Sequence, residues 1–587
     1  MLKLKLKGAR YIIRILELLE FKDIFAYPGG AILPIYDEIP FSKMRHILVR
    51  HEQAAAFAAE GYARVTGKPG ICLATSGPGA TNLVTGIADA WADSIPMIAI
   101  TGQVRQELIG TDAFQETDTT GICTPITKKT FIIKNIKDAP KILVEAYRIS
   151  ITGRPGPVLI DIPRDVQGAD IELDENWEKA IKIPVVAPLD NIDNKEFDKA
   201  VELLKKAKKP LIIAGHGVLL SDTWQKLRNF VAAEHIPAVS TILGIGVFES
   251  SDPLYFSWLG MHGMKYANDA VQEADLIMAL GIRFDDRITF KLDKFAPKAQ
   301  VIHVDIDKSE SGKNVPAKAF IHCDLKVFFE KMPLTISDSN REQRTSWVNY
   351  MQALKAKFPL KPADGKKFDM VNALSILQQN IPANAIVTTD VGQHQMWSAQ
   401  YLQRVQPNHF LTSGGLGAMG FGFPAAIGAQ AAHLDKQVWA VTGDGGFQMN
   451  IQELITLVQE NYPVKILILD NCYLGMVRQW QEQFYAKNYS GVDLFNPNFV
   501  KLVEAYHLPA VMVDNNHDFA GAILQAQQHD GPFVIHAKVL KEENVLPMVA
   551  PGTSLSDTIY YPENEYLPEV KETKSIVEKT LASINVN

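Results

Sequence analysis

The residues best able to do chemistry together lie in two segments separated by the length of a strand–helix–strand crossover. The apolar run Val438–Val441 leads into Gly443-Asp444-Gly445-Gly446, and the next apolar run ends in Asp470-Asn471. Glycines let the backbone approach a phosphate, and the N-terminus of a following helix directs N–H groups towards it. A carboxylate, an amide oxygen and a nearby backbone carbonyl suit Mg2+ held against a diphosphate. The spacing therefore predicts a magnesium–diphosphate site, whereas Gly-Asp-Gly alone would indicate only a common turn.

Elements of a parallel sheet are needed to bring these two segments together. Short apolar runs alternate with helical stretches along most of the chain. Most are apolar at consecutive positions, which is typical of strands buried on both faces of a parallel sheet. They predict an α/β fold of doubly wound parallel sheets with ligand loops at the carboxyl ends of the strands. The runs are Ile71–Thr75, Met97–Thr101, Val158–Ile162, Leu211–Ala214, Leu276–Leu280, Val301–Val304, Val438–Val441 and Lys465–Leu469.

Two polar stretches, Gly168–Asn194 and Pro333–Lys367, interrupt this alternation and are interpreted as linkers. We therefore predict three α/β domains, at 1–168, 190–332 and 368–550. A polar, partly helical tail follows at 551–587 and could close over a site. No strong internal repeat is visible, although a weak similarity between the first and third domains would not be surprising.

Composition narrows the class of protein. The 587 residues are 47% apolar and 21% charged, and the net charge of −7 comes from interspersed acidic and basic residues. This balance offers no basic field for nucleic acid, and no apolar run reaches the roughly 18–20 residues that span a bilayer. The four cysteines are scattered without a C-x-x-C pair, which fits a reducing, cytoplasmic location. They are Cys72, Cys123, Cys323 and Cys472.

Nearly the whole chain, from about Gly8 to Pro551, resembles the large, catalytic subunit of acetolactate (acetohydroxyacid) synthase, a thiamine-diphosphate-dependent enzyme. The pair Asp444 and Asn471 is the thiamine diphosphate signature. The resemblance implies an N-terminal pyrimidine-binding domain, a central FAD-binding domain and a C-terminal diphosphate-binding domain. The matching blocks are Tyr27-Pro-Gly-Gly, Arg50-His-Glu-Gln, Thr75-Ser-Gly-Pro-Gly-Ala-Thr-Asn, Gly110-Thr-Asp-Ala-Phe-Gln-Glu, Gly153-Arg-Pro-Gly-Pro-Val, Arg283-Phe-Asp-Asp-Arg, Gly414-Gly-Leu-Gly-Ala-Met-Gly-Phe-Gly and Leu474-Gly-Met-Val-Arg-Gln-Trp.

Glu52 matches the family's cofactor-activating glutamate. A carboxylic acid bonded to N1′ of the aminopyrimidine stabilises the imino tautomer, whose 4′ nitrogen takes the thiazolium C2 proton. Without the family, Glu52 would be interpreted as a charge at the start of a helix. In this family the site lies between two chains, with Glu52 from one and Asp444 from the other. A homodimer is thus the minimum implied, while a tetramer and a small regulatory subunit are left open.

The cofactor contacts are carried over from the same resemblance. The metal ligands are Asp444, Asn471 and the backbone oxygen of Tyr473. The thiamine diphosphate contacts are Glu52, Val391, Gly392, Gln393, His394, Gly417, Met419, Gly443, Asp444, Gly445, Gly446, Asn471, Tyr473, Leu474, Gly475 and Met476. FAD is expected to be structural, because the reaction transfers no electrons overall. Its contacts are Arg154, Gly215, Gly217, Thr241, Ile242, Gly260, Met261, His262, Gly281, Arg283, Asp305, Ile306 and Asp324.

Substrate residues separate this enzyme from its relatives. Arg287 resembles the arginine that receives the carboxylate of the acceptor keto acid, for which a guanidinium offers bidentate geometry. A surface ion pair with Asp286 is an equal alternative without the family. Trp480, which in isolation would be interpreted as core, resembles the tryptophan that favours 2-ketobutyrate over pyruvate. Phe114 and Gln115 match residues that flank the reacting centre.

The implied reaction decarboxylates pyruvate on thiamine diphosphate and condenses the hydroxyethyl unit with a second 2-keto acid. Pyruvate as acceptor gives 2-acetolactate and 2-ketobutyrate gives 2-aceto-2-hydroxybutyrate, for valine, leucine and isoleucine biosynthesis. A pyruvate-oxidase-like flavoenzyme and a non-catalytic cofactor-binding protein are the rival interpretations. Three residues depart from common family patterns, namely Arg105, Arg164 and Asp470, and the first two leave inhibitor sensitivity open.

Overall fold

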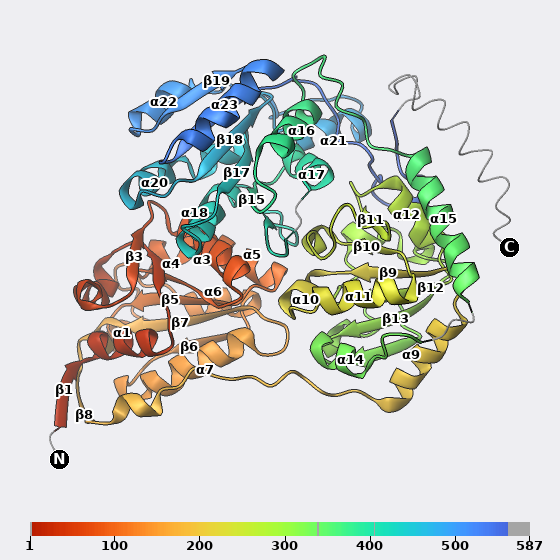
Figure 1. Ribbon diagram of the computed structural model, residues 1–587. Coiled ribbons are helices and arrows are strands. Elements are labelled where there is room, and N and C mark those ends of the chain that lie inside the picture. The colour runs from red at the N-terminus through yellow and green to blue at the C-terminus, as the bar shows by residue number, and fades with distance from the viewer. Residues whose placement is uncertain (1–2, 337–339, 404–405, 562–587) are drawn as a thin grey trace.

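The computed structural model describes residues 3–336, 340–403 and 406–561 and contains three six-stranded parallel sheets (Figure 1). In the N-terminal sheet the strand order is β3-β2-β4-β5-β7-β6. Its strands are β2 (Asp23–Ala26), β3 (Arg45–Leu48), β4 (Gly70–Ala74), β5 (Met97–Gln103), β6 (Lys129–Ile132) and β7 (Pro157–Pro163).

The central sheet has the strand order β11-β10-β9-β12-β13-β14. Numbered along the chain this is 3-2-1-4-5-6, the doubly wound order of dinucleotide-binding domains. In such a sheet ligands bind where the order reverses, which here is between β9 and β12. The strands are β9 (Pro210–Ala214), β10 (Ala238–Ser240), β11 (Tyr255–Trp258), β12 (Leu276–Leu280), β13 (Gln300–Asp305) and β14 (Ala319–His322).

The C-terminal sheet has the strand order β16-β15-β17-β18-β20-β19. Numbered along the chain within each domain, the strands of both outer sheets lie in the order 2-1-3-4-6-5. The two outer sheets therefore share one strand order, although the sequence shows no strong internal repeat. The strands are β15 (Ile386–Thr389), β16 (Phe410–Thr412), β17 (Val438–Gly443), β18 (Lys465–Asp470), β19 (Ala510–Val513) and β20 (Phe533–Lys538).

The apolar runs predicted as strands all form strands, and the predicted α/β class with doubly wound parallel sheets is confirmed. Every residue of β4, β7, β12 and β17 is buried, as expected for strands covered by helices on both faces. Most strands that the pattern did not reveal are short or lie at an edge, but β20, with six residues between β18 and β19, is neither. β10 has three residues, and the edge strand β6 is only half-buried.

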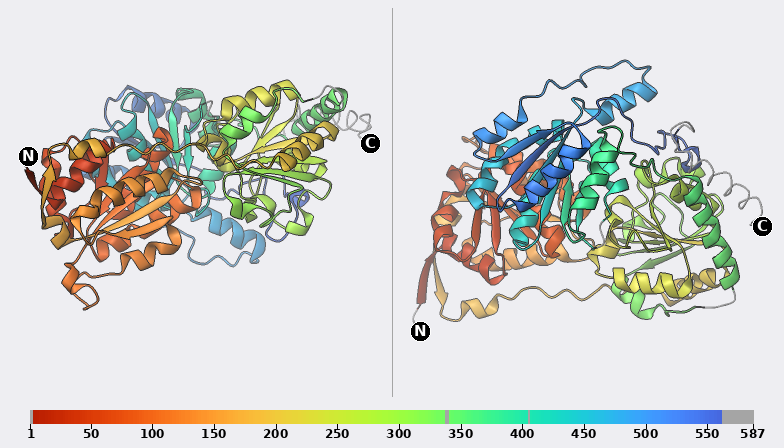
Figure 2. Two further views of the ribbon diagram at one scale, coloured as in Figure 1. Left: turned by 90° about the horizontal axis from the view of Figure 1, so that it is seen from below. Right: turned by 45° about the horizontal axis from the view of Figure 1, so that its top comes forward.

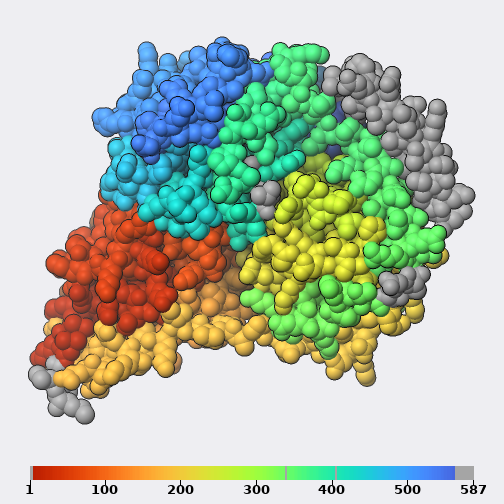
Figure 3. Space-filling model, in the orientation of Figure 1, coloured from red at the N-terminus to blue at the C-terminus, as the bar shows by residue number. Residues whose placement is uncertain are grey.

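The three domains meet one another around a common centre (Figures 1 and 2). The N-terminal, central and C-terminal domains form three contiguous blocks of the surface in Figure 3, coloured red to orange, yellow to green and cyan to blue. The outer domains share one apolar cluster. The central domain has a cluster of its own on one face of its sheet and, on the other face, a cluster that includes Ala399 and Phe410 of the C-terminal domain. Residues from the ends of all three sheets can therefore contribute to one site.

Two helices made of small residues join the outer domains. They are α3 (Glu52–Thr66) and α18 (Gly422–Ala432). A Cβ on Gly61 would lie 2.1 Å from the carbonyl oxygen of Ala425, and a Cβ on Gly428 would lie 1.8 Å from that of Ala58. The two backbones approach so closely that neither glycine can be replaced without displacement. This contact fixes α3, and with it Glu52, against the C-terminal domain of the same chain.

The predicted linkers contain ordered elements. Within Gly168–Asn194, β8 (Asp170–Asp174) pairs antiparallel with β1 (Lys3–Lys7). After the short helix η6 (Trp177–Ala180), the chain runs extended to α9 (Asn194–Lys206) (Figure 2). Within Pro333–Lys367, α15 (Arg341–Lys357) packs on the central domain. The domain boundaries stay predictions, and residues 562–587 of the expected tail lie outside the described residues. Among those that the structure describes, no helix is long and apolar enough to cross a membrane.

Candidate active site

Asp444 and Asn471 leave the same edge of the C-terminal sheet. β17 and β18 are parallel neighbours with Gly443 opposite Leu469, as the spacing predicts. Asp444 and Asn471 are both buried. Asn496, which the sequence did not single out, donates from Nδ2 to Asp444 Oδ2 at 2.6 Å. The arrangement fits the predicted Mg2+ site, although the assignment of its ligands stays a prediction.

Asp470, the residue before Asn471, has its own partners. His536 Nε2 lies 2.7 Å from its Oδ2, and the backbone N–H of Cys472 and the amide of Asn496 donate to its Oδ1 at 2.9 Å each. Burial acts to raise the pKa of Asp470, but these bonds, His536 foremost, outweigh burial and lower it. Burial instead raises the pKa of Asp444. Asn496 thus bridges two carboxylates with opposite pKa shifts.

Other candidate diphosphate residues gather around the same edge, at the ends of β15, β16, β17 and β18. A Cβ on Gly443 would lie 2.8 Å from His394 Nδ1, and one on Gly475 would lie 2.1 Å from Gln393 Oε1. His394 is buried, and its Nε2 has no hydrogen-bond partner within the described part of the chain. Burial lowers the pKa of His394 to about 4, so the ring is neutral near pH 7. A buried, unpartnered ring nitrogen is what a bound polar group would satisfy.

Asp390 is a second residue that sequence reasoning missed. It is fully buried and follows β15 directly, as Asp444 follows β17. Its carboxylate accepts the N–H groups of Val391, Gly420 and Gly422 at 2.7–3.2 Å. Asp390 therefore ties the Val391–His394 turn to the glycine-rich loop that carries Gly417 and Met419. The signal available in the sequence was a carboxylate immediately after a strand.

Glu52 is the first residue of α3 and is 7% exposed. Asn82 donates from Nδ2 to its Oε2 at 2.9 Å, and a Cβ on Gly79 would lie 3.1 Å from its Oε1. Asn82 and Gly79 belong to the block Thr75-Ser-Gly-Pro-Gly-Ala-Thr-Asn. This block therefore has a physical role beside Glu52, because it orients one carboxyl oxygen and leaves space for the other.

Glu453, also missed from the sequence, holds the backbone that leads into Glu52. It is fully buried, and its Oε1 accepts the N–H groups of Arg50 at 2.8 Å and His51 at 3.1 Å. Its Oε2 accepts from Thr456 Oγ1 at 2.7 Å. Burial raises the pKa of Glu453 to about 7. A carboxyl group of the C-terminal domain thus fixes the start of the helix that carries Glu52.

A cavity of about 890 Å³ lies where the order of the central sheet reverses. Gly215 follows β9 and Gly281 follows β12, and a Cβ on Gly217 would lie 2.7 Å from Gly281 Cα. Gly281 has φ +58°, which favours glycine. The candidate FAD residues that line this cavity are Arg154, Gly215, Gly217, Thr241, Ile242, Met261, His262, Gly281, Arg283, Asp305, Ile306 and Asp324.

Gly260 is the one FAD candidate that does not line the cavity. It has φ +118°, and a Cβ there would lie 2.6 Å from the backbone oxygen of Arg287. Its place is therefore behind Arg287. His262, in contrast, lines the cavity. Its Nδ1 lies 3.2 Å from the carbonyl oxygen of Pro547, and its Nε2 has no hydrogen-bond partner among the residues that the structure describes. Burial lowers its pKa to about 4, so a neutral ring nitrogen is available to a bound group.

Two of the four candidate substrate residues line the same cavity. Arg287 and Trp480 share it with Val391, Gly417 and Met476. The ion pair with Asp286 exists, but its atoms are 3.6 Å apart and both side chains are more than half exposed, so it stabilises little. Trp480 is half-buried on α21 (Gly475–Phe484), with its ring edge-to-face against Phe484, and is not a core residue.

Phe114 and Gln115 lie in the loop after β5. Phe114 is 88% exposed in the single chain, whereas the backbone of Gln115 lies against Gly77, whose Cβ would be 2.8 Å from the Gln115 oxygen. The buried side chain of Gln103 anchors this loop, donating to the carbonyl of Thr117 and to Asp161 at 2.9 Å each. The structure therefore brings Gln115 near the Glu52 segment and leaves Phe114 outside the cavity.

Comparison with known proteins agrees with this division of the chain. The N-terminal thiamine pyrophosphate (thiamine diphosphate) binding domain of thiamine pyrophosphate enzymes matches residues 6–122, their central domain matches 197–332, and their C-terminal binding domain matches 390–537. The acetolactate synthase large subunit of Corynebacterium glutamicum is 46% identical over 568 residues, which cover 95% of this chain and 90% of that protein.

Relatives from other lineages are similar over the same length. The acetolactate synthase isozyme 2 large subunit of Escherichia coli is 43% identical over 94% of this chain and 99% of its own. The chloroplastic acetolactate synthase 2 of Nicotiana tabacum is 42% identical over 94% of this chain and 85% of its own. With this identity over nearly the full length and all three domains matched in order, the chain belongs to the acetolactate synthase large-subunit family of thiamine-pyrophosphate-dependent enzymes.

Proposed function

We propose that this chain is the catalytic subunit of an acetolactate synthase that acts on pyruvate. It removes carbon dioxide from one pyruvate and joins the remaining two-carbon unit to a second pyruvate or to 2-ketobutyrate. The products, 2-acetolactate and 2-aceto-2-hydroxybutyrate, lead to the branched-chain amino acids. The observation that carries the proposal is one cavity that holds Arg287 and Trp480 together with Val391, Gly417 and Met476.

The chain's own residues divide the work around thiamine diphosphate, which when bound supplies the electron sink for decarboxylation. Glu52 would exchange a proton with the aminopyrimidine of the bound cofactor, and Asn82 keeps its carboxyl group oriented. Asp444, Asn471 and the Tyr473 carbonyl hold Mg2+, which the burial of the two side chains at one sheet edge supports. His394 offers its unpartnered ring nitrogen to the same cofactor.

FAD is proposed as a bound, structural cofactor in the central cavity. The support is the position of the cavity at the reversal of a dinucleotide-binding sheet, lined by glycines and by the cationic side chains of Arg154 and Arg283. The candidate thiamine residues Val391, Gly417 and Met476 also line this cavity, so a flavin there would reach towards the other cofactor.

Arg287 is proposed to receive the carboxylate of the acceptor keto acid. Its side chain is 57% exposed within the single chain, and its long ion pair with Asp286 is easily exchanged for a bidentate pair. Trp480 would restrict the space beside the acceptor's alkyl group. The nearly full exposure of Phe114 supports a site completed by a second chain, since a large apolar ring is seldom left in water.

A homodimer is the proposed working unit. The relatives named large subunits support a small regulatory partner for this chain as well, while a tetramer stays open. A reducing, cytoplasmic location, predicted from the scattered cysteines, is part of the same proposal.

The test is an assay of the purified chain with Mg2+, thiamine diphosphate and FAD, first with pyruvate alone and then with pyruvate plus 2-ketobutyrate. We expect carbon dioxide with 2-acetolactate in the first case, and added 2-aceto-2-hydroxybutyrate in the second. Dissolved oxygen is followed in the same vessel. Stoichiometric oxygen consumption with peroxide would instead identify a pyruvate-oxidase-like flavoenzyme, and no carbon dioxide would indicate a non-catalytic protein.

A further inference from the structure

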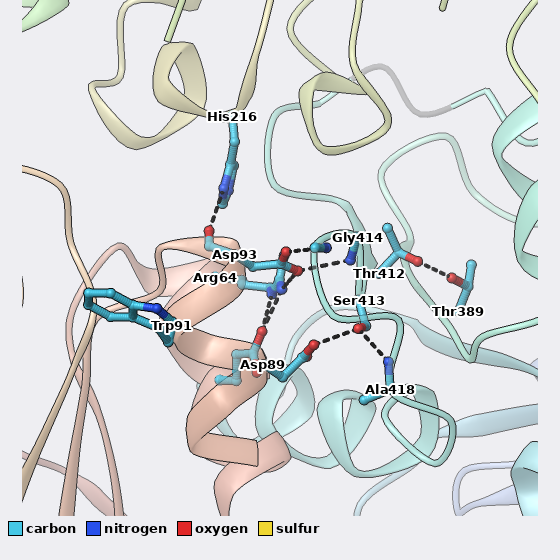
Figure 4. A network of polar contacts seen from close by, with 12 residues as sticks. Arg64, Asp89, Trp91, Asp93, His216, Thr389, Thr412, Ser413, Gly414 and Ala418 are labelled. Atoms are coloured by element: carbon cyan, nitrogen blue, oxygen red, sulfur yellow. Dashed lines mark hydrogen bonds and ion pairs between the residues drawn. The ribbon is translucent and has the colours of Figure 1, made fainter. Parts of the chain in front are cut away.

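Asp93 makes contact with all three domains at the wall of the large cavity (Figure 4). It is the last residue of α5 (Val84–Asp93) in the N-terminal domain and is 1% exposed. Its carboxylate accepts the backbone N–H groups of Gly414 at 3.0 Å and Gly415 at 2.6 Å, both from the C-terminal domain. Its backbone oxygen lies 2.9 Å from Nδ1 of His216 in the central domain.

The loop that Asp93 holds carries candidate thiamine residues. Gly414 and Gly415 follow β16 and precede Gly417 and Met419. Since these N–H groups belong to a loop, no helix or strand satisfies them, and Asp93 does so instead. Ser413 adds to the attachment, because its hydroxyl donates to Asp89 Oδ1 at 2.6 Å and accepts the N–H of Ala418 at 2.9 Å (Figure 4).

The opposite side of this helix end faces the candidate flavin residues. Arg154 donates from Nε to Ser94 Oγ at 2.8 Å and from Nη2 to the Trp91 carbonyl at 3.2 Å, and its guanidinium lies over the Trp91 ring. Arg154, Ser94, Asp93 and His216 all line the cavity. A series of hydrogen bonds therefore connects Arg154 and His216, through residues 91–94, to the loop that carries Gly417.

A buried arginine keeps the helix end rigid. Arg64 of α3 donates from Nη2 to Asp93 Oδ2 at 2.6 Å and to Glu60 Oε1 at 2.5 Å. Glu60, Asp89 and Asp93 lie close together, and the guanidinium of Arg64 is the cation among them. Burial raises the pKa of Glu60 to about 7 and that of Asp89 well above its usual range, because it disfavours the charged form of each group.

We propose that Asp93 is a positioning residue that couples occupancy of the central cavity by FAD to the affinity of the neighbouring loop for thiamine diphosphate. The inference rests on the proposed function, since it requires both cofactors. A ligand against Arg154 and His216 restrains residues 91–94, and Asp93 passes this restraint to the backbone of Gly414 and Gly415. By linkage, each cofactor then tightens the binding of the other by the same factor.

Binding of thiamine diphosphate with Mg2+ to the full chain is measured by titration calorimetry, with the chain stripped of FAD and then saturated with it. We expect FAD to tighten this binding at least about fivefold in the native chain, and by about twofold or less in Asp93→Asn. The asparagine has one acceptor oxygen, whereas Asp93 uses both of its oxygens as acceptors. A merely structural role would lower thermal stability without changing the ratio of the two affinities.

Glu234→Gln is the matched control, because it alters a buried carboxylate–arginine pair, with Arg344, far from the loop of Gly417. This control should keep the native coupling factor. If Asp93→Asn does not fold, Gly415→Ala tests the same contact from the other side, since its Cβ would lie 2.7 Å from Asp93 Oδ1. If the coupling factor of the tested variant equals that of the native chain, the inference is wrong, and it is also wrong if FAD does not change the thiamine diphosphate affinity of the native chain. In both cases the proposed function is unaffected. A native chain that binds neither cofactor overturns the proposed function as well.

Discussion

Glu52 is buried and is oriented by Asn82, and no ion pair reaches it from the described part of the chain. Replacing it in Glu52→Gln keeps the shape and the contact with Asn82 but removes the proton that a carboxyl group exchanges. We expect thiamine diphosphate binding to remain close to native while turnover falls about 100-fold or more. Hydrogen–deuterium exchange at the thiazolium C2 of the bound cofactor, read by NMR after acid quench, measures the step itself. Native exchange rates in this variant would show that Glu52 has no part in proton transfer.

Asp444 is the only candidate metal ligand that carries a charge. Mutation of a residue that orients a metal ligand typically costs about 10–100-fold in metal affinity. Removing the ligand itself in Asp444→Ala should therefore weaken Mg2+-dependent cofactor binding at least about 100-fold. Titration of Mg2+ at fixed thiamine diphosphate measures this loss. Asp435→Ala, which removes an exposed carboxylate from the same domain, is the control and should bind as the native chain does. An unchanged Mg2+ dependence in Asp444→Ala would place the metal elsewhere.

At the scale of elements, Glu453 joins the segment after α19 (Asp444–Met449) to the start of α3. Its pKa, raised by burial to about 7, means that the folded chain retains a proton that the unfolded chain releases. The stability from this group is complete below the unfolded pKa and is lost as pH rises through about 7, by on the order of 3 kcal/mol at most. The thermal midpoint of the native chain, measured relative to that of Glu453→Gln, should therefore decrease as the pH is raised from 5 to 8.

The comparison is made by calorimetry at several pH values in the same ionic strength. Glu38→Gln, which removes a partly exposed carboxylate of the N-terminal domain, serves as the control and should follow the native profile. Parallel profiles for the native chain and Glu453→Gln would show that Glu453 has the same pKa in the folded and unfolded chain.

The contact between α3 and α18 leads to a prediction about packing. In Gly61→Ala the added methyl group meets the backbone of Ala425, which cannot rotate away as a side chain can. We expect a loss of about 1–3 kcal/mol of stability. Gly521→Ala in α23 (Asn516–Gln528), where nothing lies within 4 Å, is the matched control and should be neutral or stabilising. Equal thermal midpoints for both variants would mean that the helices separate without cost.

These elements also separate what the sequence reveals from what it does not. Fully buried strands such as β12 and β17 were predictable because a short run of consecutive apolar residues is typical of a strand buried on both faces of a parallel sheet. Edge strands such as β6 mix polar and apolar residues and resemble loops. Asp444 and Asn471 were predictable because their spacing reflects adjacent strands. Glu453 and Asp93 were not, since each acts on backbone N–H groups far away in sequence, and this depends on how domains pack.

At the scale of the whole molecule, the proposed dimer predicts complementation between inactive chains. A hybrid of Glu52→Gln with Asp444→Ala would have one site with both defects and one with neither. If the two variants assemble at random, half of the dimers are hybrids with one intact site, so activity should recover to about a quarter of native.

Co-expression with two different affinity tags, followed by tandem purification, isolates the hybrid and raises the expected recovery to about half. Two differently tagged chains that both carry Glu52→Gln serve as the control for tagging and should stay inactive. A hybrid as inactive as its parents would place both residues in a site within one chain.

The reciprocal glycines of α3 and α18 suggest how such a molecule arose. Each helix follows the second strand of its sheet, and each places an alanine and, three residues later, a glycine against its counterpart: Ala58 and Gly61, Ala425 and Gly428. This is the pattern of a self-complementary contact between two identical partners. The outer domains thus resemble a fused pair of duplicated domains. The first carries Glu52, the candidate partner of the aminopyrimidine ring, and the other carries the candidate diphosphate residues. A half-turn that superposes α3 on α18 should then carry β2–β7 onto β15–β20 strand by strand.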